Sequence, residues 1–171
     1  MSSLFKVFSF VGFMALLGNA AAGTVSVGVN GGYGLADDNA LTSDEMHFAQ
    51  VYGQYQFDGG FGIEGGYNYF GGAEVNSIDV VDHGPFAAAS LNADVGSNLQ
   101  LSAKAGAMFS IQDGDAPNDH CISPFVGVGA QFAFSDAIYG RLGYDHYFKV
   151  NNNDVIDTDL DMFYAGLGLR Y

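Results

Sequence analysis

Hydrophobic and polar residues alternate along most of this chain with a period of two, which is the pattern of a half-buried β-strand. In residues 99–110, leucine, alanine and phenylalanine occupy the odd positions, whereas Gln100, Ser102 and Lys104 occupy even positions. The same alternation occurs in residues 24–35, 48–57, 61–70, 86–94, 99–110, 124–134, 137–149 and 160–171. The pattern therefore predicts an all-β protein with eight strands.

The segments that connect these strands alternate in length. Residues 58–60 (DGG), 95–98 (VGSN) and 135–136 (SD) are short enough to form hairpin turns. The other connections are long, and they hold most of the 19 acidic residues of the chain. All short turns would lie at one end of the strands and all long loops at the other. This asymmetry, together with strand lengths near 10 residues, is typical of bacterial outer-membrane β-barrels.

The two faces of the strands indicate which side contacts lipid. One face is rich in large apolar residues, and the other carries glycine, serine, asparagine and glutamine with few charges. We predict that lipid covers the apolar face and that the polar face lines a closed, eight-stranded, antiparallel up-and-down transmembrane barrel. Two girdles of outward aromatic residues are expected: Tyr55, Phe57, Phe61, Phe132, Phe134 and Tyr171 near the turns, and Tyr33, Tyr69, Phe109, Tyr144, Phe148 and Phe163 near the loops.

The first 22 residues differ from the rest of the chain. A segment that contains Lys6 is followed by the apolar run VFSFVGFMALLG and by the small residues of NAAAG, which is the layout of a secretory signal peptide. We predict cleavage after Ala22, so that residues 1–22 are removed and residues 23–171 form the barrel domain. Loss of Lys6 makes the net charge one unit more negative than −14, and this acidity disfavours nucleic acid as a partner.

Three charged residues of the polar face, Glu64, Lys104 and Arg141, lie at similar distances from the turn end. An eight-stranded barrel is just wide enough for side chains to fill its interior, so these three residues are predicted to form a buried ion cluster. We interpret the cluster as a structural plug, with a gate whose re-pairing opens a narrow path as the alternative. The other polar lumen residues are expected to be Gln54, Asn92, Gln131 and Asp145.

Four segments resemble the transmembrane domain of the OmpA-like outer-membrane proteins: GIEGGYNYFGGAE (62–74), SPFVGVGAQFAF (123–134), IYGRLGYDHYF (138–148) and YAGLGLRY (164–171). The resemblance implies an eight-stranded barrel with an interior salt-bridge network, which Glu64, Lys104 and Arg141 match by position. The family pattern usually has an acid at the position of Gln131 and a lysine at that of Asn92. Both departures remove charge from a gate made of two ion pairs.

The last strand also resembles the signal that the barrel-assembly machinery recognises, and its residues are Phe163, Leu167, Leu169 and Tyr171. Outer-membrane lipid, lipopolysaccharide and this machinery are therefore the expected partners. The function is expected to be structural support of the outer membrane, with acidic loops as a contact surface. A narrow porin-like channel gated by the lumen cluster is one alternative, and an adhesin or surface receptor that acts through the loops is another.

Catalysis, cofactors and metal binding are not expected. No serine accompanies the four histidines in a strand arrangement that would suit a hydrolase. The acidic segment DVIDTDLD (154–161) lacks the glycine and the distal glutamate of a calcium loop, and is interpreted as a solvated face. Cys121 is the single cysteine, so an internal disulfide is excluded.

Overall fold

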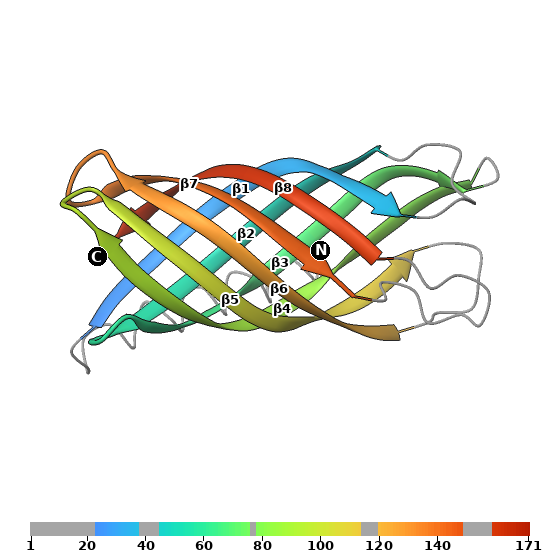
Figure 1. The fold of residues 1–171 in the computed structure, drawn as a ribbon. Helices are drawn as coiled ribbons and strands as arrows, with labels where there is room; N and C mark the ends of the chain where they lie inside the picture. Colours follow the sequence, from blue (N-terminus) through green and yellow to red (C-terminus); the bar gives the residue numbers. More distant parts are fainter. Residues whose placement is uncertain (1–22, 38–44, 76–77, 114–119, 149–158) are drawn as a thin grey trace.

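The computed structural model describes residues 23–37, 45–75, 78–113, 120–148 and 159–171. They form eight strands: β1 (Gly23–Asp37), β2 (Glu45–Phe57), β3 (Phe61–Val75), β4 (Ile78–Val95), β5 (Leu99–Asp113), β6 (His120–Ala133), β7 (Ile138–Tyr147) and β8 (Asp159–Arg170). Each strand pairs antiparallel with the next, and β8 pairs with β1 (Figure 1). The predicted closed eight-stranded barrel is thereby confirmed. Within the described ranges, no helix is long and apolar enough to cross a membrane.

The three short connections lie together at one end of the barrel, on the left in Figure 1. The turn between β2 and β3 contains Gly59 and Gly60 with φ angles of 96° and 85°, and the turn between β4 and β5 contains Gly96 with φ of 83°. Residues other than glycine rarely adopt this left-handed conformation. These glycines therefore allow the tight reversals that the sequence pattern predicted.

The strands at the opposite end extend further than the alternation indicated. Residues 71–84 were predicted to be a loop, but β3 continues to Val75 and β4 begins at Ile78. Val75 pairs with Ile78, and a register shift lies between Phe70 and Ala73. We attribute the error to the surroundings of the β3–β4 hairpin extension, which is the part of these two strands within residues 71–84. Strand residues that project beyond lipid need no apolar face, so their sequence lacks the alternation by which the other strands were recognised.

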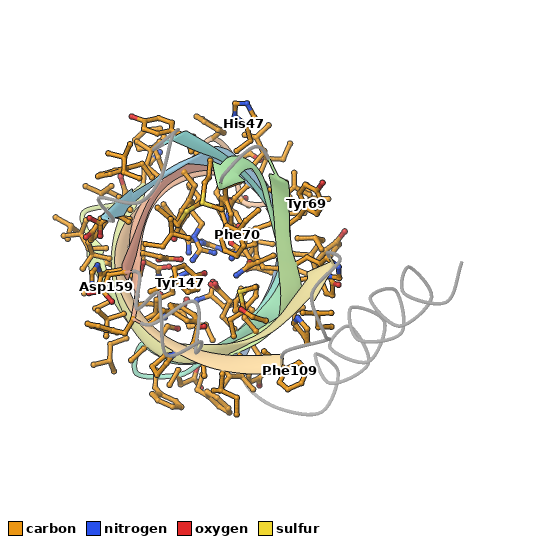
Figure 2. All side chains as sticks on the ribbon, turned by 90° about the vertical axis from the view of Figure 1, so that its right-hand side faces the viewer. His47, Tyr69, Phe70, Phe109, Tyr147 and Asp159 are labelled. Carbon is orange, nitrogen blue, oxygen red and sulfur yellow. The ribbon has the colours of Figure 1, made fainter. Side chains whose placement is uncertain are left out.

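The outer wall of the barrel is apolar, as predicted. It carries exposed aliphatic side chains such as Leu91 and Leu142, each 64% exposed. Viewed from the loop end, Tyr69 and Phe109 of the outer girdle point away from the barrel (Figure 2). Tyr55 is an exception among the predicted girdle residues. It is only 5% exposed: it forms a buried cluster with Val25, and its ring packs edge-on against Phe57 with centroids 4.7 Å apart.

The inner wall is not polar throughout, and here the prediction was wrong. Phe70 and Tyr147 point into the barrel (Figure 2). They belong to a buried interior cluster that also contains Met46, Phe48, Tyr52, Phe86, Ala88, Met108, Phe125, Leu160, Met162 and Tyr164. A barrel of eight strands leaves no room for a wide aqueous lumen, so large side chains fill it.

Candidate functional site

Four charged side chains meet inside the barrel. Lys104 Nζ lies 3.2 Å from Glu64 Oε1 and 2.8 Å from Asp145 Oδ2, and Arg141 Nη2 lies 2.8 Å from Glu64 Oε2. All four side chains are 3% exposed or less. The lumen cluster, defined as these four residues, therefore contains two acids and two bases, whose charges balance where water is excluded.

The strands position this cluster through their pleat. Glu64 belongs to β3, Lys104 to β5, and Arg141 and Asp145 to β7, and each occupies an inward position of its strand. Gly127 of β6 lies between Lys104 and Asp145 across the sheet, and a Cβ atom there would overlap the Asp145 carboxylate. A glycine on the intervening strand thus leaves space for the ion pair.

Asp145 was predicted to line the lumen, but its role as the second acid was missed. Gln131 and Asn92 suggested a cluster that lacks one charge pair. Because Asp145 has the same strand parity as Arg141, it faces the same interior and reaches Lys104. Whether an acidic residue occupies an inward position of its strand therefore predicts its place in the cluster better here than the family pattern does.

Aromatic rings surround the two cations. Lys104 Nζ lies 5.3 Å from the ring centroid of Tyr164 and 5.4 Å from that of Phe125. The guanidinium carbon of Arg141 lies 4.5 Å from the centroid of Tyr52. Ring faces attract cations most strongly where water is excluded. The aromatic groups thus stabilise the charges that the two carboxylates also neutralise.

An apolar layer fills the lumen between this cluster and the loop end. Phe48 stacks on Phe70 with centroids 5.4 Å apart, and Phe125 stacks on Tyr147 at 4.8 Å. Phe70 meets Tyr147 edge-on at 5.7 Å, which joins the two pairs across the barrel. We call these four residues the aromatic layer. Each of them lies an even number of positions from a polar lumen residue of the same strand and therefore faces inward. This spacing was the sequence signal that could have revealed them.

A chain of amide hydrogen bonds crosses the lumen beside the aromatic layer. Asn30 Nδ2 donates to Gln50 Oε1 over 2.6 Å, and Gln50 Nε2 donates to Asn68 Oδ1 over 2.8 Å. Asn68 Nδ2 then donates to the hydroxyl oxygen of Tyr147 over 2.9 Å. Buried polar networks of this kind rigidify a core when their members are paired. The chain links β1, β2, β3 and β7.

Apart from Asp145, the predicted polar lumen residues lie on the turn side of the lumen cluster. Gln131 Nε2 donates to Gln54 Oε1 over 3.4 Å, and Gln54 Nε2 donates to the hydroxyl of Ser90 over 3.3 Å. Asn92 Nδ2 donates to the same Ser90 hydroxyl over 3.2 Å. Gln54 and Gln131 are buried, whereas Asn92 is half-buried and lies close to the turns. These groups form a second, hydrogen-bonded layer below the ions.

Neither His47 nor His146 faces the lumen. His47 points outward (Figure 2), and His146 Nδ1 lies 2.6 Å from Asp161 Oδ1 on the outer wall. Tyr144 donates its hydroxyl to the same carboxylate oxygen over 2.6 Å. Among the described residues, no group of three histidine, cysteine or acidic side chains is arranged to hold a metal ion. His120 and Cys121 lie in a part of β6 whose side chains are outside the described set.

The described interior is a stack of packed layers. The four charged side chains of the lumen cluster are paired with one another, and the aromatic layer lies on their loop side.

The comparisons with known proteins agree with this architecture. The family model of the OmpA-like transmembrane domain matches residues 18–171. The crystal structure of Neisserial surface protein A superposes with a TM-score of 0.71 at 16% identity, covering 86% of this chain and 97% of that one. The N-terminal barrel domain of Pseudomonas aeruginosa OprF gives a TM-score of 0.63 at 12% identity, covering 88% and 98% of the two chains.

Ail, the attachment invasion locus protein of Yersinia pestis, was solved with the heparin analogue sucrose octasulfate. It gives a TM-score of 0.58 at 16% identity and covers 88% of this chain and 99% of its own. These identities establish a shared fold alone. A search of curated protein sequences found no match. Because the family model spans the whole barrel, this chain belongs to the OmpA-like transmembrane domain family and is a β-barrel protein of the bacterial outer membrane.

Proposed function

We propose that this protein is a closed barrel that supports the outer membrane mechanically and does not conduct solutes. The observation that carries the proposal is the lumen cluster, whose four buried charged groups are paired with one another beneath the aromatic layer. Paired charged side chains and stacked rings fill this part of the lumen. The structural role predicted from the sequence is therefore preferred over the channel.

A gate at the lumen cluster would face two obstacles. Lys104 contacts two carboxylates and Glu64 contacts two cations, so re-pairing within the cluster exchanges partners without widening the lumen. Separating a buried ion pair costs about 3–5 kcal/mol. Phe70 and Tyr147 would still close the loop side. A channel thus requires rearrangement of both layers together.

Contact with other surfaces is the second candidate function, and the charge of the chain favours cationic partners. Ail binds a heparin analogue, which is a polyanion, in the structure mentioned above. This chain has 19 acids and 5 bases. The described basic residues Lys104, Arg141 and Arg170 occupy inward positions, so the described outer wall offers no lysine or arginine to a polyanion.

The experiment is complementation of a deletion strain, read as uptake of a hydrophobic fluorescent dye that an intact outer membrane excludes. We expect deletion to increase uptake. Both the full protein and a folded variant with residues 149–158 replaced by a short turn should restore exclusion. Unchanged uptake after deletion would contradict structural support. Failure of the shortened variant, at equal abundance in the membrane, would assign the function to the loops.

Export and assembly remain predictions. Phe163, Leu167, Leu169 and Tyr171 are all exposed on the outer wall, where an assembly factor could reach them. We infer that deleting Tyr171 lowers the amount of folded barrel in the membrane. Unchanged assembly of this variant would argue against the signal.

A further inference from the structure

The turn end of the barrel contains a cavity of about 220 Å³, and the residues of interest in its wall are Asp94, Ser97, Asn98, Gln100, Gln131 and Arg170. A water molecule occupies roughly 30 Å³ in the liquid, so the space accommodates a small organic molecule. The cavity lies on the side of the lumen cluster that faces the turns. In outer-membrane barrels, the short turns face the periplasm.

Arg170 is the one cation of the described strands that has no acidic partner. Lys104 and Arg141 pair with carboxylates in the lumen cluster. The Arg170 guanidinium instead donates from Nη2 to Gln131 Oε1 over 3.3 Å and lies 5.3 Å from the centroid of Tyr139. A guanidinium has five N–H donors, so donors remain for a two-pronged contact with a carboxylate ligand.

Asp94 supplies a negative charge in the wall of the same cavity. Gln100 Nε2 donates to its Oδ1 over 2.8 Å, and Gln100 itself is only 7% exposed. A buried amide therefore holds the carboxylate in place, just as the buried Gln131 holds Arg170. The second carboxylate oxygen of Asp94 can accept a hydrogen bond from a ligand.

Opposite charges in one cavity select for a ligand that carries both charges. An anion alone would meet repulsion from Asp94, and a cation alone would meet repulsion from Arg170. We propose that this cavity binds a small zwitterion of the α-amino-acid class, with its carboxylate on Arg170 and its ammonium group on Asp94. Because the lumen cluster closes the interior beyond Gln131, the cavity opens only toward the turn end, and a ligand bound there would not pass through the barrel.

Neighbouring cavities provide matched controls. A cavity of about 270 Å³ shares Arg170 but has Asp136 of the β6–β7 turn as its acid. Another, of about 320 Å³, contains Asp58 and shares Asp94, but lacks Arg170. The proposal places ligand binding at Asp94 and Arg170, so neutralising Asp136 or Asp58 should have little effect.

The test is a titration of the refolded mature protein in detergent micelles with glycine, methylammonium and acetate, followed by proton–nitrogen NMR of the Gln100 and Arg170 side chains. Glycine should produce saturable shifts. The two single-charge probes should bind at least about tenfold more weakly than glycine, which corresponds to a loss of roughly 1.4 kcal/mol of binding free energy. Asp94→Asn should weaken glycine binding by about the same factor, whereas Asp136→Asn and Asp58→Asn should stay within about twofold.

Arg170→Gln provides a second variant if the first does not fold, and it should remove glycine binding while strengthening methylammonium binding, because the repulsion from Arg170 is lost. Three results would overturn the proposal. They are the absence of saturable shifts with glycine, acetate binding as tight as glycine binding, and loss of glycine affinity in Asp136→Asn equal to that in Asp94→Asn.

Discussion

The substitution Glu64→Gln tests how the lumen cluster stabilises the barrel. Glu64 contacts both cations, at 3.2 Å from Lys104 and 2.8 Å from Arg141. After the substitution Lys104 keeps Asp145 at 2.8 Å, but Arg141 loses the acid that the structure shows beside it. A buried charge without a partner costs about 3–5 kcal/mol, and we expect the free energy of unfolding to fall by that amount.

Asp145→Asn is the matched comparison, because it removes the other acid. Both cations would still contact Glu64, so no charge is left alone. The loss is then that of one charge-assisted hydrogen bond, about 1.5–3 kcal/mol. A double variant, Glu64→Gln with Arg141→Met, removes the uncompensated charge and should recover most of the stability lost in Glu64→Gln.

Urea-induced unfolding of the protein in lipid vesicles measures these differences. The midpoint should fall in the order wild type, Asp145→Asn, Glu64→Gln, with an unchanged slope, because the surface exposed on unfolding is the same. The reasoning would be refuted if Glu64→Gln lost less than about 1 kcal/mol, or if Asp145→Asn proved as destabilising as Glu64→Gln.

Three further substitutions probe other layers. Phe125→Ala, which removes a ring that is 1% exposed, should lower the free energy of unfolding by about 3–5 kcal/mol in the same urea assay. Leu142→Arg, on the lipid face near mid-strand, should cost about 2–4 kcal/mol in vesicles, and a neutral result would contradict its placement in hydrocarbon. A Cβ atom at Gly32 would overlap the Phe163 carbonyl, whereas the nearest atom at Gly31 is 3.9 Å away, so Gly32→Ala but not Gly31→Ala should reduce the yield of folded barrel.

The number of strands and their inside–outside pattern could be predicted from the sequence, because lipid imposes alternation wherever a strand crosses it. Leu91 and Leu142 show this on the outer wall. The hairpin extension that includes Ile78 could not be recognised, since it lies where neither face must be apolar. A strand can be recognised from its sequence pattern only where its two faces lie in different environments.

The lumen was predicted in part. Glu64, Lys104 and Arg141 were expected to meet at one level, and the structure places them in contact. The acid that completes the cluster is the one whose side chain can reach Lys104 across the barrel. Sequence spacing alone did not distinguish Asp145 from other polar residues. The aromatic layer was overlooked because inward phenylalanines such as Phe125 lie beside outward apolar residues, and parity along each strand is what separates them.

Single-channel recording of the folded mature protein in a planar bilayer tests the closed-lumen account most directly, with Glu64→Ala measured in parallel. The account predicts no discrete openings in the wild type. It also predicts none in Glu64→Ala, because the stacked rings of Phe125 and Tyr147 still fill the loop side of the lumen. Discrete wild-type openings whose conductance or frequency changes in Glu64→Ala would contradict the account and make the lumen cluster a gate.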